Sequence, residues 1–277
     1  MQLGYHTNSL QNHRLPEALL LLAEHGYQAV AITPDTCHLD PAVTSEGQLD
    51  ELALRLRDLG LLPVMETGAR FLLDPRHKHE PTLMTRDPAA RQRRLDFYSR
   101  VAAMGRRLGA RVVSFWAGID RAPGPDSGQL LLDGVRQTAA RIRAEGLEPA
   151  LEPEPGMAVE TVADWRRVHA ALGAEAPGLT LDIGHLYAVW EDEPVAVIAS
   201  VASHLLQVHL EDMCRGEHEH RLPGTGDVNF AAVLSALETA GYQGPVCFEL
   251  SRSSHAAPTA VATCRDVWNR CLGRPVR

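Results

Sequence analysis

The chain has 277 residues, 45% of them hydrophobic, and a formal net charge of −8 at pH 7. This acidic balance argues against a nucleic-acid or anionic-membrane partner, because such partners need a basic face. No apolar run approaches the roughly 18 residues that a transmembrane helix needs.

The five cysteines are scattered along the chain and form no Cys-x-x-Cys motif. An odd number of dispersed cysteines favours reduced thiols over a disulfide framework. The segment Met1–His6 shows no basic region followed by an apolar stretch, so no signal peptide is predicted. We therefore expect a cytoplasmic protein.

Short apolar runs alternate with longer amphipathic stretches along the whole chain. Several of the runs are continuously apolar, as in parallel strands that are covered on both faces. The predicted strands are Gln2–His6, Ala29–Thr33, Leu62–Glu66, Arg111–Trp116, Glu148–Glu152, Leu179–Ile183, Leu205–Leu210 and Val246–Leu250. The predicted helices are Pro16–Glu24, Gln48–Leu59, Asp87–Leu108, Leu130–Ala144, Val162–Leu172, Pro194–Ser200, Phe230–Ala240 and Thr259–Leu272.

Eight strand–helix units over this length predict one α/β domain, a single (β/α)8 TIM barrel that spans residues 1–277. A doubly wound open sheet is the alternative, but no Gly-x-Gly-x-x-Gly follows the first strand. Long segments, Arg70–Pro88 and Glu211–Asn229, follow the third and seventh strands. His77, Lys78 and His79 in the first segment could reach an anionic group of a substrate, or could belong to a solvated loop.

Four of the predicted strands end in a residue that can bind a metal ion. These residues are Glu152, Asp182, His209 and Glu249, in chain order. The carboxyl ends of barrel strands share one mouth, so the four side chains would surround one point. Taken singly, each could instead cap a helix or form a surface ion pair. Three carboxylates and one imidazole make a hard site, for which we expect Mn2+, with Mg2+, Co2+, Fe2+ or Zn2+ as alternatives.

Other strand ends carry polar or aromatic residues, namely His6, Glu66 and Trp116. Each could line the site or make a structural hydrogen bond. Glu154 shares a strand face with Glu152, and Glu152 is the preferred ligand because it directly ends the apolar run.

The chain resembles the xylose isomerase-like TIM-barrel superfamily, which includes sugar-phosphate isomerases and epimerases, ketose 3-epimerases, inosose dehydratase and endonuclease IV. The motifs that carry the resemblance are Leu151-Glu-Pro-Glu-Pro-Gly156, Leu181-Asp-Ile-Gly-His185, Val208-His-Leu-Glu-Asp212, Arg221-Leu-Pro-Gly-Thr-Gly-Asp-Val-Asn-Phe230 and Phe248-Glu-Leu250. By this resemblance, Glu152 and Glu249 double as acid/base groups, and His185 and Arg221 bind substrate oxygens. Glu154 departs from the Asn or His that is common two or three positions after Glu152, though it could bind a hydroxyl or a cation.

The resemblance implies a divalent-metal-dependent isomerase or epimerase of a sugar or sugar phosphate. It would abstract a proton alpha to a carbonyl through a metal-stabilised enediolate. The alternatives are an inosose-dehydratase-like lyase, an endonuclease IV-like phosphodiesterase and a non-catalytic metabolite-binding barrel. The expected partner is a small sugar or polyol, with neither nucleic acid nor membrane, and the resemblance also implies a homo-oligomer.

Overall fold

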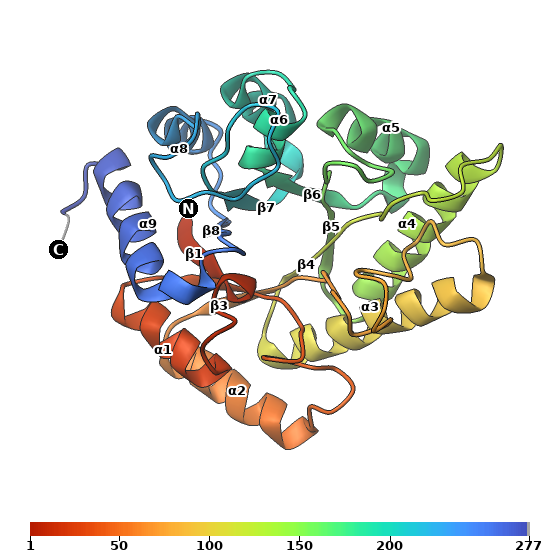
Figure 1. The fold of residues 1–277 in the computed structure, drawn as a ribbon, viewed down its shortest axis with the longest axis horizontal. Coiled ribbons are helices and arrows are strands. Elements are labelled where there is room, and N and C mark those ends of the chain that lie inside the picture. The colour runs from red at the N-terminus through yellow and green to blue at the C-terminus, as the bar shows by residue number, and fades with distance from the viewer. Residues whose placement is uncertain (276–277) are drawn as a thin grey trace. The chain divides into compact units, whose positions relative to one another are not determined.

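The computed structural model describes residues 1–275, and its eight strands form a closed parallel barrel in chain order (Figure 1). The predicted fold class is confirmed. The strands are β1 Gln2–His6, β2 Ala29–Ile32, β3 Leu62–Met65, β4 Val112–Phe115, β5 Glu148–Leu151, β6 Gly178–Asp182, β7 Leu205–Leu210 and β8 Pro245–Phe248. Strand β2 is buried along its whole length, as its continuous apolar sequence predicts.

The helices alternate with the strands and begin and end within a few residues of their predicted bounds. They are α1 Leu15–Glu24, α2 Glu46–Asp58, α3 Pro88–Leu108, α4 Ser127–Ala144, α5 Val162–Leu172, α6 Ile183–Ala188, α7 Pro194–Val201, α8 Phe230–Thr239 and α9 Ala257–Cys271. None of those in the described part of the chain is long and apolar enough to cross a bilayer.

Two differences from the predicted elements lie beside candidate site residues. The strand predicted to end at Ile183 ends at Asp182, whose side chain caps the short unpredicted helix α6. Strand β8 ends at Phe248, two residues earlier than predicted, and the N–H of Leu250 donates to Ser9 Oγ at 2.7 Å. At this position a side-chain oxygen, instead of the backbone of a neighbouring strand, accepts the hydrogen bond.

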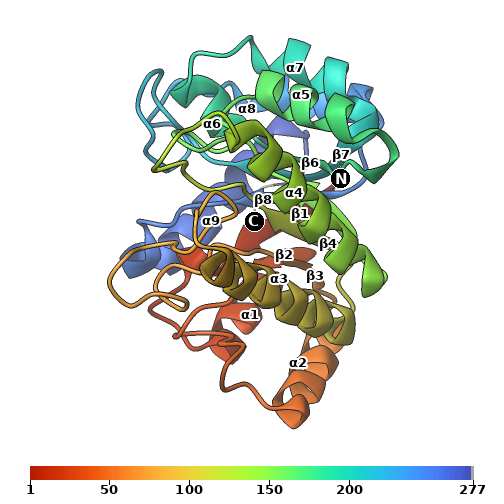
Figure 2. The ribbon, with the colours of Figure 1, turned by 90° about the vertical axis from the view of Figure 1, so that its right-hand side faces the viewer.

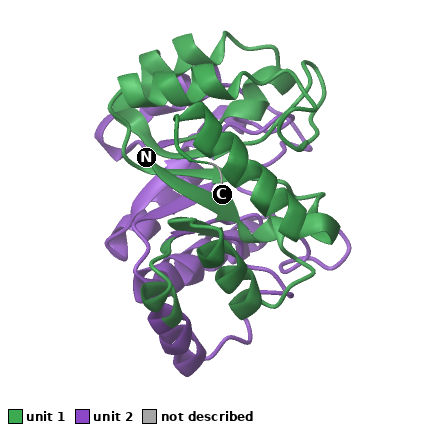
Figure 3. Ribbon diagram, turned by 90° about the vertical axis from the view of Figure 1, so that its left-hand side faces the viewer, with its two compact units in different colours: residues 1–31, 55–62, 180–277 green, residues 32–54, 63–179 purple. Residues whose placement is uncertain are grey.

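The chain divides into two compact units (Figure 3). Unit 1 comprises Met1–Ala31, Arg55–Leu62 and Thr180–Arg277. In this unit β8 lies between β1 and β7, with Val246 paired to Leu3 on one side and to Val208 on the other. The carboxyl ends of these three strands are therefore held side by side.

Unit 2 comprises Ile32–Leu54 and Pro63–Leu179. Strand β4 pairs with β3 through Met65 and Val113, and with β5 through Phe115 and Leu151. Helices α3 and α4 pack alongside each other over these strands (Figures 1 and 2). The single domain over residues 1–277 stays a prediction.

The first prediction concerns the start of α5. Thr161 Oγ1 accepts the N–H of Asp164 at 3.1 Å, and Asp164 Oδ2 accepts the N–H of Thr161 at 3.0 Å, which is a complete capping box. We expect Thr161→Ala to lower the free energy of unfolding by about 1 kcal/mol, measured by urea denaturation. Thr239→Ala is the control, because that exposed hydroxyl bonds only to the Ser235 carbonyl in its own helix. Equal losses in the two variants would contradict the capping role.

Candidate metal centre

Asp182 sits at the junction of β6 and α6 and uses its two carboxylate oxygens differently. Oδ1 accepts the backbone N–H of His185 at 2.9 Å and so caps α6. Oδ2 lies 3.6 Å from His185 Nε2 and 3.6 Å from His209 Nδ1. The cap fixes the carboxylate so that its second oxygen faces two imidazoles.

His209 near the end of β7 links Asp182 to Glu249. Its Nδ1 lies 3.5 Å from Glu249 Oε2, in addition to its contact with Asp182. Around a tetrahedral ion with ligands at about 2.1 Å, neighbouring ligand atoms lie about 3.4 Å apart. The distances from His209 to Asp182 and from His209 to Glu249 are each close to this spacing of neighbouring ligands.

The electrostatics of this cluster keep both carboxylates ionised. Burial raises the pKa of Asp182, but the neighbouring His185 and His209 outweigh burial and hold the value well below its ordinary range. Burial also opposes ionisation of Glu249, yet His6, His220 and His209 lower its pKa to about 2. Two ionised carboxylates are suitable ligands for a hard cation.

Residues at the end of β1 support Glu249. Asn8 Nδ2 donates to Glu249 Oε1 at 2.7 Å, which orients the carboxylate and leaves Oε2 toward His209. The ring of His6 packs edge-on against His209 with centroids 4.3 Å apart. His6 was predicted as a site residue, whereas Asn8 was missed because it lies beyond the strand end.

Two further polar residues of the site were missed on the strand that carries His209. Gln207 Nε2 lies 2.9 Å from His209 Nε2, the ring atom opposite the one that faces the carboxylates. Glu211 is fully buried, and its Oε1 accepts the N–H of Gly184 at 2.9 Å. A Cβ at Gly184 would collide with that oxygen. Burial and the nearby Asp182 raise the pKa of Glu211 well above its ordinary value. The signal was the alternation of Gln207, His209 and Glu211 on one strand face.

A second group of histidines lies within unit 1. His185, His218 and His220 bring one ring nitrogen each to within 4.8 Å of the others. Burial, with His185 and His220 next, lowers the pKa of His218 to about 4, so its ring is neutral at pH 7. His220 Nδ1 also lies 3.1 Å from the Glu249 carbonyl oxygen. Three imidazole nitrogens at these distances are suitably placed for a second cation.

The loop that carries His218 and His220 is organised by Asp212, which is almost completely buried. Its Oδ1 accepts the N–H groups of Met213 and Val228, and its Oδ2 accepts those of Gly224 and Thr225. One carboxylate thus satisfies four backbone donors of residues 213–228.

Arg221, predicted to bind substrate, is engaged within its own loop. Its Nη2 lies 2.7 Å from Glu217 Oε2 and 2.8 Å from Glu219 Oε2, and the side chain is 31% exposed. Its backbone N–H donates to the Asp212 carbonyl at 2.8 Å. A substrate-binding role for Arg221 stays a prediction.

The remaining predicted site residues belong to unit 2, each at or just after a strand end. Glu152 follows β5, is almost fully buried, and donates its N–H to the Phe115 carbonyl at 2.8 Å. Glu66 and Trp116 are likewise buried directly after β3 and β4, and Glu154 is half-buried. Their grouping with the residues of unit 1 stays a prediction.

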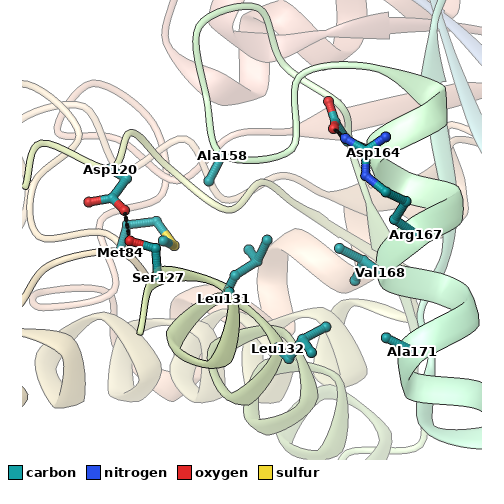
Figure 4. Close-up of a pocket in the computed structure, with 11 residues that line it drawn as sticks. Met84, Asp120, Ser127, Leu131, Leu132, Ala158, Asp164, Arg167, Val168 and Ala171 are labelled. Atoms are coloured by element: carbon teal, nitrogen blue, oxygen red, sulfur yellow. Dashed lines mark hydrogen bonds and ion pairs between the residues drawn. The ribbon is translucent and has the colours of Figure 1, made fainter. Parts of the chain in front are cut away.

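Unit 2 also contains a cavity of about 480 Å³ between α4 and α5 (Figure 4). Apolar side chains such as Leu131 and Val168 point into it. Its polar lining includes Asp120, which accepts a hydrogen bond from Ser127 at 2.6 Å. No imidazole lines this cavity, which lacks the donor set of the centre in unit 1.

Comparison with known proteins identifies the family of this chain. The model of the Xylose isomerase-like TIM barrel family matches residues 19–270. The inosose dehydratase of Lacticaseibacillus casei is 23% identical over 45% of this chain and 47% of that protein, so the match spans about half of the relative's length. The L-ribulose 3-epimerase of Mesorhizobium japonicum is 26% identical over 83% of this chain and 74% of that protein.

Solved structures share the fold over almost the whole chain. The IolI protein with a bound zinc atom has a TM-score of 0.79 and 19% identity, covering 99% of this chain and 98% of that one. A structure of L-ribulose 3-epimerase has a TM-score of 0.76 and 21% identity, covering 98% and 93%.

The second prediction tests the role of Asp212. In Asp212→Asn an amide NH2 would face two backbone donors in place of an oxygen. We expect the local opening free energy at Gly224 and Thr225 to fall by about 2 kcal/mol, measured by amide hydrogen exchange. Asp227→Asn is the control, because the Asp227 carboxylate accepts a bond from Arg215 N alone within this loop. Unchanged exchange in Asp212→Asn would show that the loop is held by other contacts.

Proposed function

Because the chain belongs to the Xylose isomerase-like TIM barrel family, we propose that it is a divalent-metal-dependent isomerase or epimerase of a sugar or sugar phosphate. The observation that carries this proposal is the placement of the Asp182 and Glu249 carboxylates within 3.6 and 3.5 Å of the same His209 nitrogen in unit 1. The relatives named above include enzymes that act on small sugars and polyols, which supports an enzymatic role.

The proposed ligands are Asp182, His209, Glu249 and Glu152. Strands β5 and β6 are parallel neighbours, with Leu151 paired to Leu179, so Glu152 and Asp182 leave the sheet at the same edge. Three carboxylates favour Mn2+, with Mg2+, Co2+, Fe2+ or Zn2+ as alternatives. The zinc atom in the similar IolI structure supports a divalent metal without deciding among these ions.

The proposed mechanism uses the two glutamates as a general base and a general acid. When bound, the metal ion would polarise a substrate carbonyl and so acidify the adjacent C–H group. Glu249, which is ionised at neutral pH, accepts that proton. Glu152 returns a proton on the other side of the same carbon or to its neighbour, which gives an epimer or an isomer. His185, Arg221, His6, Glu66, Trp116 and Glu154 are the proposed substrate contacts.

A lyase of the inosose-dehydratase kind is the second candidate. It shares the first proton abstraction and then expels a hydroxyl group beta to the carbonyl. The similarity to inosose dehydratase favours a lyase over a phosphodiesterase or a non-catalytic barrel, although the match spans half of that protein. Product analysis separates the lyase from the epimerase, since dehydration yields an unsaturated carbonyl product and epimerisation does not.

We also propose that the protein acts in the cytoplasm, as its cysteine pattern predicts. Within the described residues the cysteines form no disulfide. A homo-oligomer remains an expectation from the resemblance.

The third prediction concerns metal content. The protein as purified should contain about one divalent ion per chain by elemental analysis, and Asp182→Ala should lose it on dialysis, because one ligand and the cap of α6 are removed together. Adding Mn2+ to the stripped wild type should raise its melting temperature.

Asp192→Ala is the matched control, because Asp192 is exposed and lies in the same chain segment. Equal metal content in Asp182→Ala and wild type would remove the proposed centre. Two or three equivalents would indicate that the histidine group of His185, His218 and His220 is also occupied, and would favour a phosphodiesterase.

The fourth prediction concerns the two acid/base residues. Ketoses, inososes and their phosphates are incubated in D2O, and deuterium incorporation at carbon is followed by NMR. We expect Glu249→Gln and Glu152→Gln to slow exchange by about a hundredfold or more, because an amide cannot accept the proton. Exposed Glu238→Gln should exchange at the wild-type rate. Near wild-type exchange in either active-site variant would refute its assigned role.

A further inference from the structure

Arg94 is a fully buried cation in unit 2 that lacks a charged partner. On α3, its Nη2 donates to the Thr67 carbonyl at 2.8 Å. Its guanidinium lies against the aromatic rings of Phe97, Tyr98 and Trp116, with the Trp116 centroid at 4.5 Å. Its Nε and Nη1 make no hydrogen bond within residues 1–275.

No acidic side chain in the described part of the chain forms an ion pair with Arg94. Two acids of the segment 70–80 pair elsewhere, Asp74 with His77 at 3.0 Å and Glu80 with Arg121 at 2.7 Å. Burying an ionised group without a counter-charge is costly, because low-dielectric surroundings replace its hydration. Contact with the aromatic rings offsets part of this free-energy cost. The N–H groups of Nε and Nη1 still have no acceptor.

His79 is a half-buried imidazole beside the same indole. Its ring lies edge-on to Trp116 with centroids 5.2 Å apart, and its Nδ1 makes no hydrogen bond within the described residues. Burial, followed by the positive charges of Lys78, Arg94 and Arg70, lowers the pKa of His79 to about 3. The surroundings are therefore positive, and the ring is neutral at pH 7. The neighbouring His77 is instead exposed and paired with Asp74.

We propose that Arg94, beside the rings of His79 and Trp116, is the donor of a binding site for an oxyanion. A planar guanidinium fork matches the oxygens of a phosphate ester or a carboxylate. As an extension that rests on the proposed function, the anion is the charged group of the sugar substrate. The chain would then act on phosphorylated or acidic sugars in preference to neutral ones.

The segment that carries His79 is the part of this site that has to move. The donor nitrogens of Arg94 are shielded from solvent, so an entering anion must displace a neighbouring group. Arg70 and His79 have φ angles of 38° and 68°, in the left-handed region that non-glycine residues rarely adopt. These two positions bracket the segment, and the N–H of His79 donates to the Arg70 carbonyl.

The fifth prediction is tested by titrating inorganic phosphate and acetate into the full-length protein by calorimetry. We expect Arg94→Gln to weaken binding by about tenfold or more, because one charge-assisted pair is lost. Arg93→Gln, an exposed arginine one residue away on α3, should bind as the wild type does. Tighter phosphate than acetate binding would identify a phosphate ester as the natural ligand, and the reverse order a carboxylate.

The titration is repeated after loading with Mn2+, so that anions bound at the metal centre appear as a component independent of Arg94. If Arg94→Gln does not fold by circular dichroism, Arg94→Lys replaces it, with an expected loss of about fivefold because the planar guanidinium fork is lost. Equal affinities in the wild type and the site variant, or no anion binding by the wild type, would overturn the proposal. Since no turnover is needed, failure of the isomerase assays would leave this result intact.

Discussion

The centre in unit 1 depends on the pairing of buried carboxylates with imidazoles. Asp182 and Glu249 stay ionised in a buried setting because histidines face them, with His209 between the two. Ionised carboxylates without such partners would take up protons and lose their ability to bind a cation. Asp182 also caps α6, so the geometry of a helix start and that of the ligands are fixed by one side chain. The supporting residues Asn8 and Gln207 act by orienting Glu249 and His209.

Much of this arrangement could be predicted from the sequence. In the barrel, strands that follow one another in the chain are also neighbours in space. Apolar runs that end in Asp182 and His209 indicated both the strands and the candidate ligands. The end of β8 was predicted two residues beyond its actual position. The reason is that the N–H of Leu250 donates to Ser9, which is distant in the sequence. Asn8 could not be assigned for a similar reason. Its role depends on a contact with Glu249, which no local pattern reveals.

The two units differ in the groups that surround their buried ionisable side chains. In unit 1, the carboxylates of Asp182 and Glu249 both face the imidazole of His209. In unit 2, Arg94 is enclosed by aromatic rings and one carbonyl, without an acid. Buried ionisable groups that have partners can be stable by themselves. The guanidinium of Arg94, by contrast, has N–H groups without acceptors. Buried groups that lack partners are uncommon in proteins, and they often mark places where a ligand or ion completes the structure.

The Asp212 carboxylate has a consequence for how ligands are recognised. By holding four backbone N–H groups, it keeps residues 213–228 in one conformation before any ligand arrives. A loop that is already ordered loses little conformational entropy on association, so more of the contact energy appears as affinity. Such a loop also discriminates by rigid shape, because it cannot reshape itself around a poorly fitting molecule. The shape that this loop presents is therefore set during folding.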